Sequence, residues 1–264
     1  MGLWIAPLFS GSSGNCTLIK TENTRILIDA GLAGKRISDA LLSVGEDIAD
    51  IDAIIITHEH SDHIKGVGVL SRRYDIPVFA NAETWCEMEA KVGSMALSNE
   101  RIIDKCDFYI GELCIEPFSV SHDAANPFAY SVYGGGAKVT VLTDTGRATR
   151  EILSHAQESK IVLLESNHDI EMLKNGSYPK VLKDRILSTR GHLSNADAAA
   201  AAAELYKCGT RGIMLGHLSR ENNTESVAFG TVCEELKKTG LIAGRDLALK
   251  IAQKDCATGI YEVK

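Results

Sequence analysis

The 264-residue sequence has no apolar run long enough to cross a bilayer, which takes about 20 residues in a helix. Its first residues, MGLWIAPLFS, lack the basic start and the long apolar segment of a secretory signal. We therefore expect no membrane partner and no export.

Cysteine is present, but not in an arrangement that predicts disulfides or a zinc finger. The seven cysteines are scattered and odd in number, and no two of them form a CxxC pair. This pattern favours a reducing cytoplasm. An excess of basic residues is also missing, because the net charge is −7. That charge argues against a broad basic nucleic-acid surface but leaves room for a local basic patch.

Short apolar strands alternate with amphipathic helices, and no linker-like stretch divides the chain. We expect residues 1–264 to form one α/β domain with two sheets and outer helices. The expected strands are 3–9, 16–20, 25–29, 51–57, 77–80, 113–121, 128–133, 138–143, 161–165, 212–215, 247–251 and 258–263. The expected helices are 35–44, one starting near 63, 82–92, 149–156, 170–174, 179–187, one around the alanines 198–203, and 224–239.

The densest group of chemically active side chains is THEHSDH, which directly follows three isoleucines. On an extended segment, residues i and i+2 point the same way, so His58 and His60 can hold one divalent ion. A turn after His60 would let Asp62 and His63 face a second ion. Two ions are the economical interpretation, because four close ligands on one ion leave little room for a water. The alternative is a solvated polar loop with accidental spacing.

Four further polar residues each end an apolar run elsewhere in the chain. His122 lies in VSHDAANPFAY, Asp144 in VLTDTGR and His217 in IMLGHLSREN. Asp29 in ILIDAG has the same placement. Residues that end neighbouring strands gather at one edge of a sheet, so we expect these four to complete the site.

This ordered set of motifs resembles the metallo-β-lactamase superfamily of hydrolases along nearly the whole chain. The resemblance implies a four-layer αββα sandwich of the metallo-β-lactamase type, with two mixed sheets, outer helices and a binuclear site at one edge. It implies that the first ion is bound by His58, His60 and His122, and the second by Asp62, His63 and His217. Asp144 would bridge the two ions, and Asp29 would orient the HxHxDH loop. Ligands of nitrogen and oxygen alone admit zinc, manganese or iron.

Two near-copies, GHLSNAD and GHLSREN, each precede an expected helix. A histidine beside a helix N-terminus, with Ser and Asn around it, suits a phosphate. Because the resemblance assigns His217 to metal, His192 is free to bind a phosphate oxygen or to protonate the leaving group. Ser194 and Asn195 would add phosphate contacts. The alternative is a histidine that only hydrogen-bonds within its own loop.

Three other segments are candidates for phosphate contacts. His168, in ESNHD, follows a strand at the same expected edge and could assist His192. The loop SGSSGN offers Ser12, Ser13 and free backbone N–H groups to an anion, although a plain turn explains it equally well. Residues 174–190 carry a local charge of +4 and could guide substrate phosphates, although a solvated helix face is the commoner explanation.

Within the superfamily, the segments SGSSGN, THEHSDH, ESNHD, GHLSN and HLSRENN resemble the small bacterial nucleases of the YycJ (WalJ) type. Glu165 and His192 are similar to the accessory acidic and histidine motifs of β-CASP nucleases such as ribonuclease J. Only 26 residues separate the two, so no separate β-CASP domain fits between them. The resemblance implies a DNA substrate held through its backbone phosphates, 5′-to-3′ exonuclease action and a role in DNA repair.

The expected chemistry is phosphodiester hydrolysis by a hydroxide held between two ions about 3.5–4 Å apart. Asp62 would bind metal and orient the water, while His192 and His168 would hold the phosphate or protonate the leaving oxygen. The first alternative is a small-molecule hydrolase for a cyclic phosphodiester, thioester or lactone, which needs a closed pocket. A metal-binding partner protein without catalysis would be indicated by a missing ligand, and none is missing.

Overall fold

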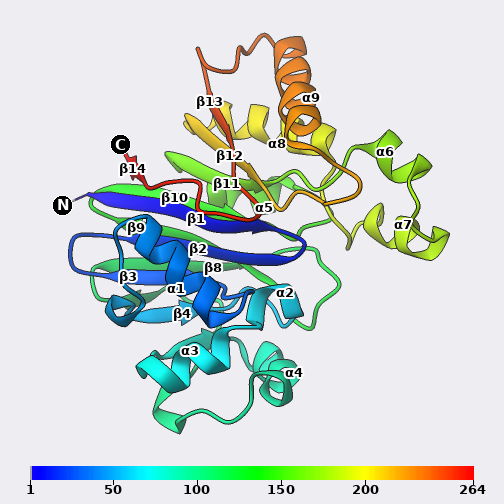
Figure 1. Ribbon diagram of the computed structural model, residues 1–264. Coiled ribbons are helices and arrows are strands. Elements are labelled where there is room, and N and C mark those ends of the chain that lie inside the picture. Colours follow the sequence, from blue (N-terminus) through cyan, green and yellow to red (C-terminus); the bar gives the residue numbers. More distant parts are fainter. Residues whose placement is uncertain (1) are drawn as a thin grey trace.

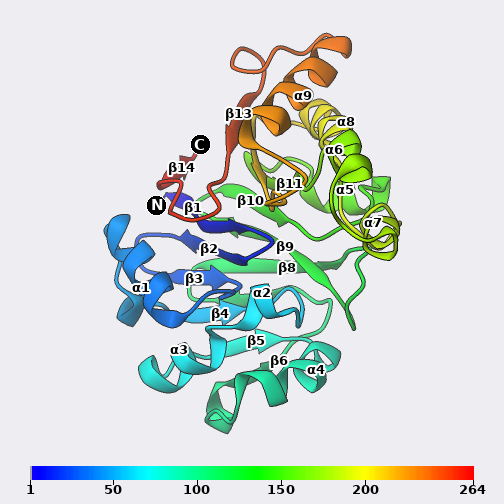
Figure 2. The same cartoon turned by 45° about the vertical axis from the view of Figure 1, so that its right-hand side comes forward.

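The computed structural model describes residues 2–264 of the chain. Two seven-stranded sheets pack face to face, and helices cover the outer face of each sheet (Figures 1 and 2). This is a four-layer αββα sandwich, so the predicted fold class is confirmed.

The first sheet combines the N-terminal part of the chain with its last strand. It is antiparallel over its first four strands and parallel from the fourth to the seventh. In spatial order its strands are β14 (Tyr261–Val263), β1 (Leu3–Gly11), β2 (Gly14–Lys20), β3 (Arg25–Ile28), β4 (Ala53–Ile55), β5 (Val78–Ala80) and β6 (Glu100–Ile102).

The second sheet is also mixed, with parallel pairing over its first four strands and antiparallel pairing over the rest. In spatial order its strands are β13 (Ala248–Ile251), β12 (Gly212–Gly216), β11 (Ile161–Glu165), β10 (Ala137–Leu142), β9 (Phe128–Gly134), β8 (Leu113–Ser119) and β7 (Phe108–Ile110). The edge strands β6 and β7 were not expected from the sequence. Both are only three residues long, and Ile102 and Tyr109 on them are exposed, so they lack a buried apolar pattern.

Nine α-helices lie within residues 2–264, and none of these helices is both long and apolar enough to cross a membrane. The first sheet is covered by α1 (Gly34–Ser43), α2 (Ser61–Ile64), α3 (Val67–Tyr74) and α4 (Ala82–Val92). The second sheet is covered by α5 (Arg150–Ala156), α8 (Asn195–Lys207) and α9 (Glu225–Lys238). The short helices α6 (Ile170–Asn175) and α7 (Lys180–Ile186) project beyond the edge of the second sheet (Figure 1). Two 3₁₀ turns, Ile48–Asp50 and Leu97–Asn99, complete the set.

Three apolar layers hold the sandwich together. The central layer lies between the sheets and contains residues of both, such as Ile5 on β1 and Met214 on β12. The two outer layers join each sheet to its helices. Burial of one Leu or Ile side chain contributes about 1.5–3 kcal/mol, so these layers fix the strand ends at the sandwich edge firmly.

Candidate metal centre

The candidate site forms where strands of both sheets end at one edge of the sandwich. Asp29 directly follows β3, and the HxHxDH loop follows β4. From the other sheet, Glu165 ends β11, while Asp144 and His217 come after β10 and β12. The two sheets therefore contribute ligands to one cluster.

Three of these strand-end residues have a left-handed backbone. The φ angles are 62° at Asp29, 57° at Asp144 and 53° at His217. Non-glycine residues rarely adopt this conformation, and it is found mainly where the surrounding structure imposes it at functional sites. The sharp turn after each strand aims these side chains into the cluster.

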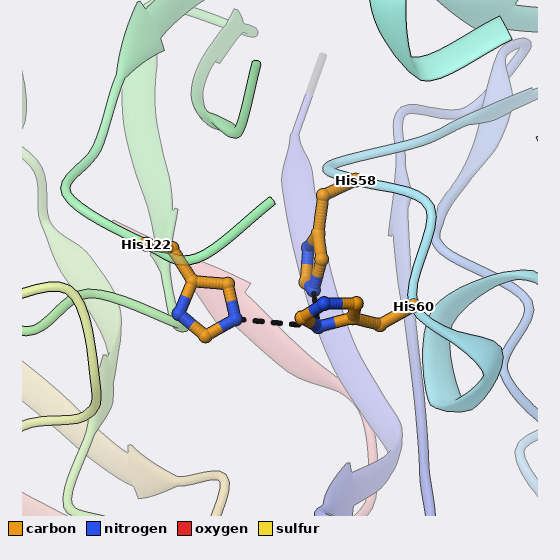
Figure 3. Close-up of side chains that lie close together, drawn as sticks. All are labelled: His58, His60 and His122. Atoms are coloured by element: carbon orange, nitrogen blue, oxygen red, sulfur yellow. Dashed lines mark hydrogen bonds between the residues drawn. The ribbon is translucent and has the colours of Figure 1, made fainter. Parts of the chain in front are cut away.

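The imidazole rings of His58, His60 and His122 converge on one point (Figure 3). Nδ1 of His60 lies 3.0 Å from Nε2 of His58 and 3.4 Å from Nε2 of His122. Nδ1 of His58 faces the Thr57 hydroxyl at 3.0 Å, and Nδ1 of His122 faces the Gly191 carbonyl at 3.1 Å. A carbonyl can only accept, so Nδ1 of His122 carries the proton, and the Nε2 lone pair faces the shared point. A divalent cation at that point would satisfy all three nitrogens.

A second cluster lies beside the first and contains two carboxylates. Nε2 of His63 is 3.4 Å from Asp144 Oδ2 and 3.5 Å from Asp62 Oδ2. Nδ1 of His217 is 2.9 Å from Asp144 Oδ2. All four residues are buried except Asp62, whose side chain is 24% exposed. Asp62 is therefore the member of this cluster that solvent reaches most easily.

Asp144 lies between the two clusters. Its Oδ2 faces His63 and His217, and its Oδ1 lies 3.8 Å from Nε2 of His122. Burial raises the pKa of this carboxyl, but His217 and His63 outweigh it and hold the pKa well below its usual range. Asp144 is thus a carboxylate with one oxygen toward each cluster.

The donor set fits divalent ions. Asp144 Oδ2 and His217 Nδ1 are buried, and neither has a hydrogen-bond partner among the described residues. Unsatisfied buried polar atoms are costly, and these two lie 2.9 Å apart without hydrogen-bond geometry between them. A cation would remove this cost. Imidazole and carboxylate donors suit zinc, manganese or iron.

Asp29 fixes the HxHxDH loop through contacts with Thr57 and His63. Its Oδ1 accepts from the Thr57 backbone N–H at 2.9 Å, and its Oδ2 lies 2.7 Å from Nδ1 of His63. Burial lowers the pKa of His63, but Asp29, Asp144 and Asp62 outweigh it and raise the pKa well above its usual value. A bound ion would replace the proton on Nε2, while Asp29 keeps the proton on Nδ1, as in other carboxylate–histidine–metal arrangements.

The loop SGSSGN contributes a residue that the sequence did not single out. Nδ2 of Asn15 lies 3.1 Å from His63 Nε2 and 3.5 Å from Asp62 Oδ2. Ser12 and Ser13 instead form the exposed turn between β1 and β2, where Ser13 Oγ accepts from the Arg220 guanidinium at 3.1 Å. Phosphate binding by Ser12 and Ser13 stays a prediction. A lone asparagine in a polar loop gives no pattern from which its contact could be predicted.

His192 lies beside the clusters and is paired with a buried acid. Its Nδ1 is 2.7 Å from Oε1 of Glu165 and 3.8 Å from Oδ1 of Asp144. Glu165 is fully buried, and its Oε2 accepts from the Thr145 N–H at 2.8 Å. Burial lowers the pKa of His192, but the Glu165 carboxylate outweighs it and raises the pKa to about 9. His192 is therefore protonated at neutral pH.

Two of the residues expected beside His192 hydrogen-bond within the protein. Ser194 caps α8, with its Oγ 3.1 Å from the Asp197 N–H, and it is buried. Asn195 is buried, and its Oδ1 accepts from the Ser166 hydroxyl at 2.7 Å. Phosphate binding by Ser194 and Asn195 stays a prediction. His168 is 1% exposed, and neither of its ring nitrogens has a hydrogen-bond partner among the described residues, so its catalytic role also stays a prediction.

The basic stretch 174–190 forms α6, α7 and the return to the site. Several of its cations have partners in the protein: Lys183 donates to the Gly176 carbonyl at 2.7 Å, and Lys174 pairs with Glu171 at 3.1 Å. Arg185 forms an ion pair with Asp123, and Arg190 Nε donates to the His122 carbonyl at 3.2 Å. The stretch is therefore not a continuous free track, but its two arginines lie next to the first cluster.

Comparison with known proteins places the chain among metal-dependent hydrolases. The family model described as "Beta-lactamase superfamily domain" matches residues 24–217. "Exodeoxyribonuclease YycJ" of Bacillus anthracis is 42% identical over 246 residues, which cover 92% of this chain and 93% of the relative. "Exodeoxyribonuclease WalJ" of Streptococcus pneumoniae is 40% identical over 267 residues, which cover 100% of this chain and 99% of the relative.

Solved structures agree on the fold. The metallo-β-lactamase fold protein YhfI from Bacillus subtilis superposes with a TM-score of 0.72 at 15% identity, covering 99% of this chain and 100% of that chain. Every motif of the superfamily that was expected from the sequence lies at the shared sandwich edge. The chain therefore belongs to the metallo-β-lactamase superfamily of hydrolases, and within it to the family that includes YycJ and WalJ.

Proposed function

We propose that this protein is a divalent-metal-dependent nuclease that acts as a 5′-to-3′ exodeoxyribonuclease, with a role in DNA repair. The observation that carries the proposal is Asp144, whose two carboxylate oxygens face two separate clusters of nitrogen and oxygen donors. Relatives that are at least 40% identical over nearly the whole chain are named exodeoxyribonucleases, which supports DNA as the substrate.

When bound, two divalent ions, zinc or manganese with iron also admitted, would activate a water for attack on phosphorus and offset the negative charge of the phosphate. His58, His60 and His122 would hold the first ion, and Asp62, His63 and His217 would hold the second. Asp144 would contribute to both positions, and Asp29 fixes the ring of His63.

Other residues of the site act on the water and the substrate. Asp62 is partly exposed and can orient the attacking water as well as bind metal. His192 is protonated at neutral pH, so it can donate to a phosphate oxygen or protonate the leaving oxygen. Asn15 donates toward His63 Nε2 and can steady a group bound at that position.

The proposed contact with DNA is local. The net charge of −7 disfavours a wide basic face, so recognition rests on the arginines beside the first cluster and on backbone phosphates. We further propose that residues 1–264 work as one domain without a separate β-CASP insertion, in the cytoplasm.

The test is digestion of 5′-phosphorylated DNA, labelled separately at each end, by protein loaded with Mn²⁺ or Zn²⁺. We expect mononucleotides to be released first from the 5′ label. The double variant Asp62→Ala, His63→Ala controls for a contaminating nuclease and should release none. Intact DNA with every metal, together with turnover of a small phosphodiester, thioester or lactone, would instead establish the small-molecule hydrolase.

A further inference from the structure

One ion pair beside the first cluster includes Arg185, one of the two arginines proposed above to contact DNA. Asp123 directly follows His122, and Arg185 lies near the end of α7, 62 positions further along the chain. The Arg185 Nε–H donates to Asp123 Oδ2 in a close ion pair. The pair connects the projecting helix α7 to the loop that carries a proposed ligand of the first ion.

The second oxygen of Asp123 faces the first cluster. Asp123 Oδ1 is buried, has no hydrogen-bond partner among the described residues, and lies 3.4 Å from Nε2 of His122. That nitrogen carries no proton, because Nδ1 of His122 donates to the Gly191 carbonyl. Two acceptors that face each other at this distance repel unless a cation, or a water bound to one, lies between them.

Arg185 lies beside the first cluster through its ion pair with Asp123, the residue next to His122. Its side chain is 50% exposed. Its pKa is raised by the hydrogen bond to Asp123, and the Asp62 carboxylate adds to the effect. A guanidinium has five N–H donors, so Arg185 can keep its contact with Asp123 and still bind a phosphate through two others.

The segment after α7 is tied to the same loop. Arg190 Nε donates to the His122 carbonyl at 3.2 Å, and the Ser121 hydroxyl donates to the Thr189 carbonyl at 2.7 Å. These bonds fix the distance between α7 and His122. Together with the ion pair to Asp123, they hold Arg185 near the loop that carries His122.

We propose that Asp123 and Arg185 act as one positioning device, which rests on the proposed nuclease function. Asp123 Oδ1 orients the first ion, either directly or through its water, and Asp123 Oδ2 holds Arg185 at the site mouth. Arg185 binds a backbone phosphate of the DNA next to the bond that is cut. The pair thus links the affinity of the first ion position to the binding of substrate.

Asp123 is tested by Mn²⁺ titration without DNA, followed by electron paramagnetic resonance. The Asp62→Ala, His63→Ala background isolates the first position, which keeps its three histidines. Asp123→Asn in this background should weaken Mn²⁺ binding by about tenfold or more, as loss of a group that orients metal ligands usually does. Asp184→Asn, which changes an exposed carboxylate on α7, is the matched control. Equal Mn²⁺ affinity in the Asp123→Asn variant and the control would overturn the role of Asp123.

Arg185 is tested by the binding of a 5′-phosphorylated, phosphorothioate-protected oligonucleotide, measured by fluorescence anisotropy at several salt concentrations. Arg185→Gln should leave Mn²⁺ affinity nearly unchanged, weaken DNA binding several-fold and lower the salt slope by about one. DNA binding equal to that of Asp184→Asn would overturn the role of Arg185. Mn²⁺ affinity and DNA affinity are both measured without turnover. A wild-type protein that binds Mn²⁺ and DNA but does not cut DNA would therefore refute the nuclease proposal and leave the roles of Asp123 and Arg185 in binding intact.

Discussion

Asp144 is the single residue on which both clusters depend. It supplies one oxygen to each, from a backbone conformation with φ of 57° that places the carboxylate between the two sheets. A neutral amide of the same shape would keep the packing but remove the charge that faces His63 and His217. The Asp144→Asn substitution therefore tests metal binding without changing the packing.

We predict that Asp144→Asn lowers the metal content from two ions per chain to one or none and reduces DNA hydrolysis by at least about 100-fold. Plasma mass spectrometry of the dialysed protein and end-label release measure the two effects. Asp75→Asn is a matched control, because Asp75 has the same left-handed φ of 57° but lies away from the site. Two retained ions in Asp144→Asn would contradict the bridging role.

Glu165 raises the pKa of His192, so replacing Glu165 should change how activity depends on pH. The raised pKa of about 9 keeps His192 protonated in the wild type, and activity should fall as the pH rises through about 9. Glu165→Gln removes the carboxylate, so the pKa should drop toward the ordinary value of about 6.5 and the alkaline limb should move to lower pH. Single-turnover rates from pH 6 to 10 check this. An alkaline limb that stays in place would show that His192 does not control the rate.

At the residue scale, sequence patterns predicted that the seven metal-ligand candidates lie close together, and metal binding by them stays a prediction; their neighbours could not be predicted. The ligands end apolar runs, which is a visible pattern, and the structure brings all seven together. Asn15, Asp123 and Arg185 act through contacts between distant segments, and nothing in their local sequence marks those contacts. Ser194 caps α8, and the same residue type serves a phosphate and a helix cap equally well, so its phosphate binding stays a prediction.

At the scale of elements, the site depends on a close approach between two loops. The loop after β3 passes so near the HxHxDH loop that a Cβ on Gly31 would lie 1.6 Å from the Asp62 carbonyl oxygen and 2.7 Å from the Asn15 nitrogen. Both are backbone atoms, so neither can turn away as a side chain would. Glycine at position 31 is therefore a requirement of the geometry that holds Asp62.

We predict that Gly31→Ala displaces the HxHxDH loop and destabilises the protein by about 1–3 kcal/mol, as overpacking of a close-packed site does. Mn²⁺ affinity should fall at the same time, and thermal unfolding with Mn²⁺ titration measures both. The control is Gly230→Ala on α9, where an added Cβ meets nothing within 4 Å. Equal Mn²⁺ affinity in Gly31→Ala and Gly230→Ala would contradict the requirement for glycine at position 31.

Element positions could be predicted where burial imposes a pattern and not elsewhere. The strand expected at 161–165 coincides with β11, which is almost entirely buried. The helix expected to start near 63 is two helices, α2 and α3, because the chain turns at Gly66, where a Cβ would lie 2.3 Å from the Leu32 carbonyl. A contact between distant segments does not change the spacing of apolar residues, so it could not be predicted from the sequence.

At the scale of the whole molecule, the proposed ions would join the two sheets. His58, His60, Asp62 and His63 follow a strand of the first sheet, whereas His122, Asp144 and His217 follow strands of the second. Bound ions would thus connect the two halves of the sandwich at one edge. An ion that binds the folded state but not the unfolded state stabilises the protein by mass action.

We predict that Mn²⁺ at about 100 times its dissociation constant stabilises the wild type by about 2.7 kcal/mol. For a chain of this size, each kcal/mol raises the unfolding temperature by about 2–4 °C. Scanning calorimetry with and without Mn²⁺ measures the shift, and Asp144→Asn should show a smaller shift than the wild type at the same Mn²⁺ concentration. An equal shift in that variant would mean that the stabilising ions bind elsewhere.

The most direct test of the account is anomalous scattering from crystals grown with Mn²⁺ or Zn²⁺. We predict two peaks per chain, one within bonding distance of His58, His60 and His122, the other of Asp62, His63 and His217, with Asp144 between them. A single peak, or peaks away from these side chains, would contradict the two-ion site from which the nuclease mechanism is built.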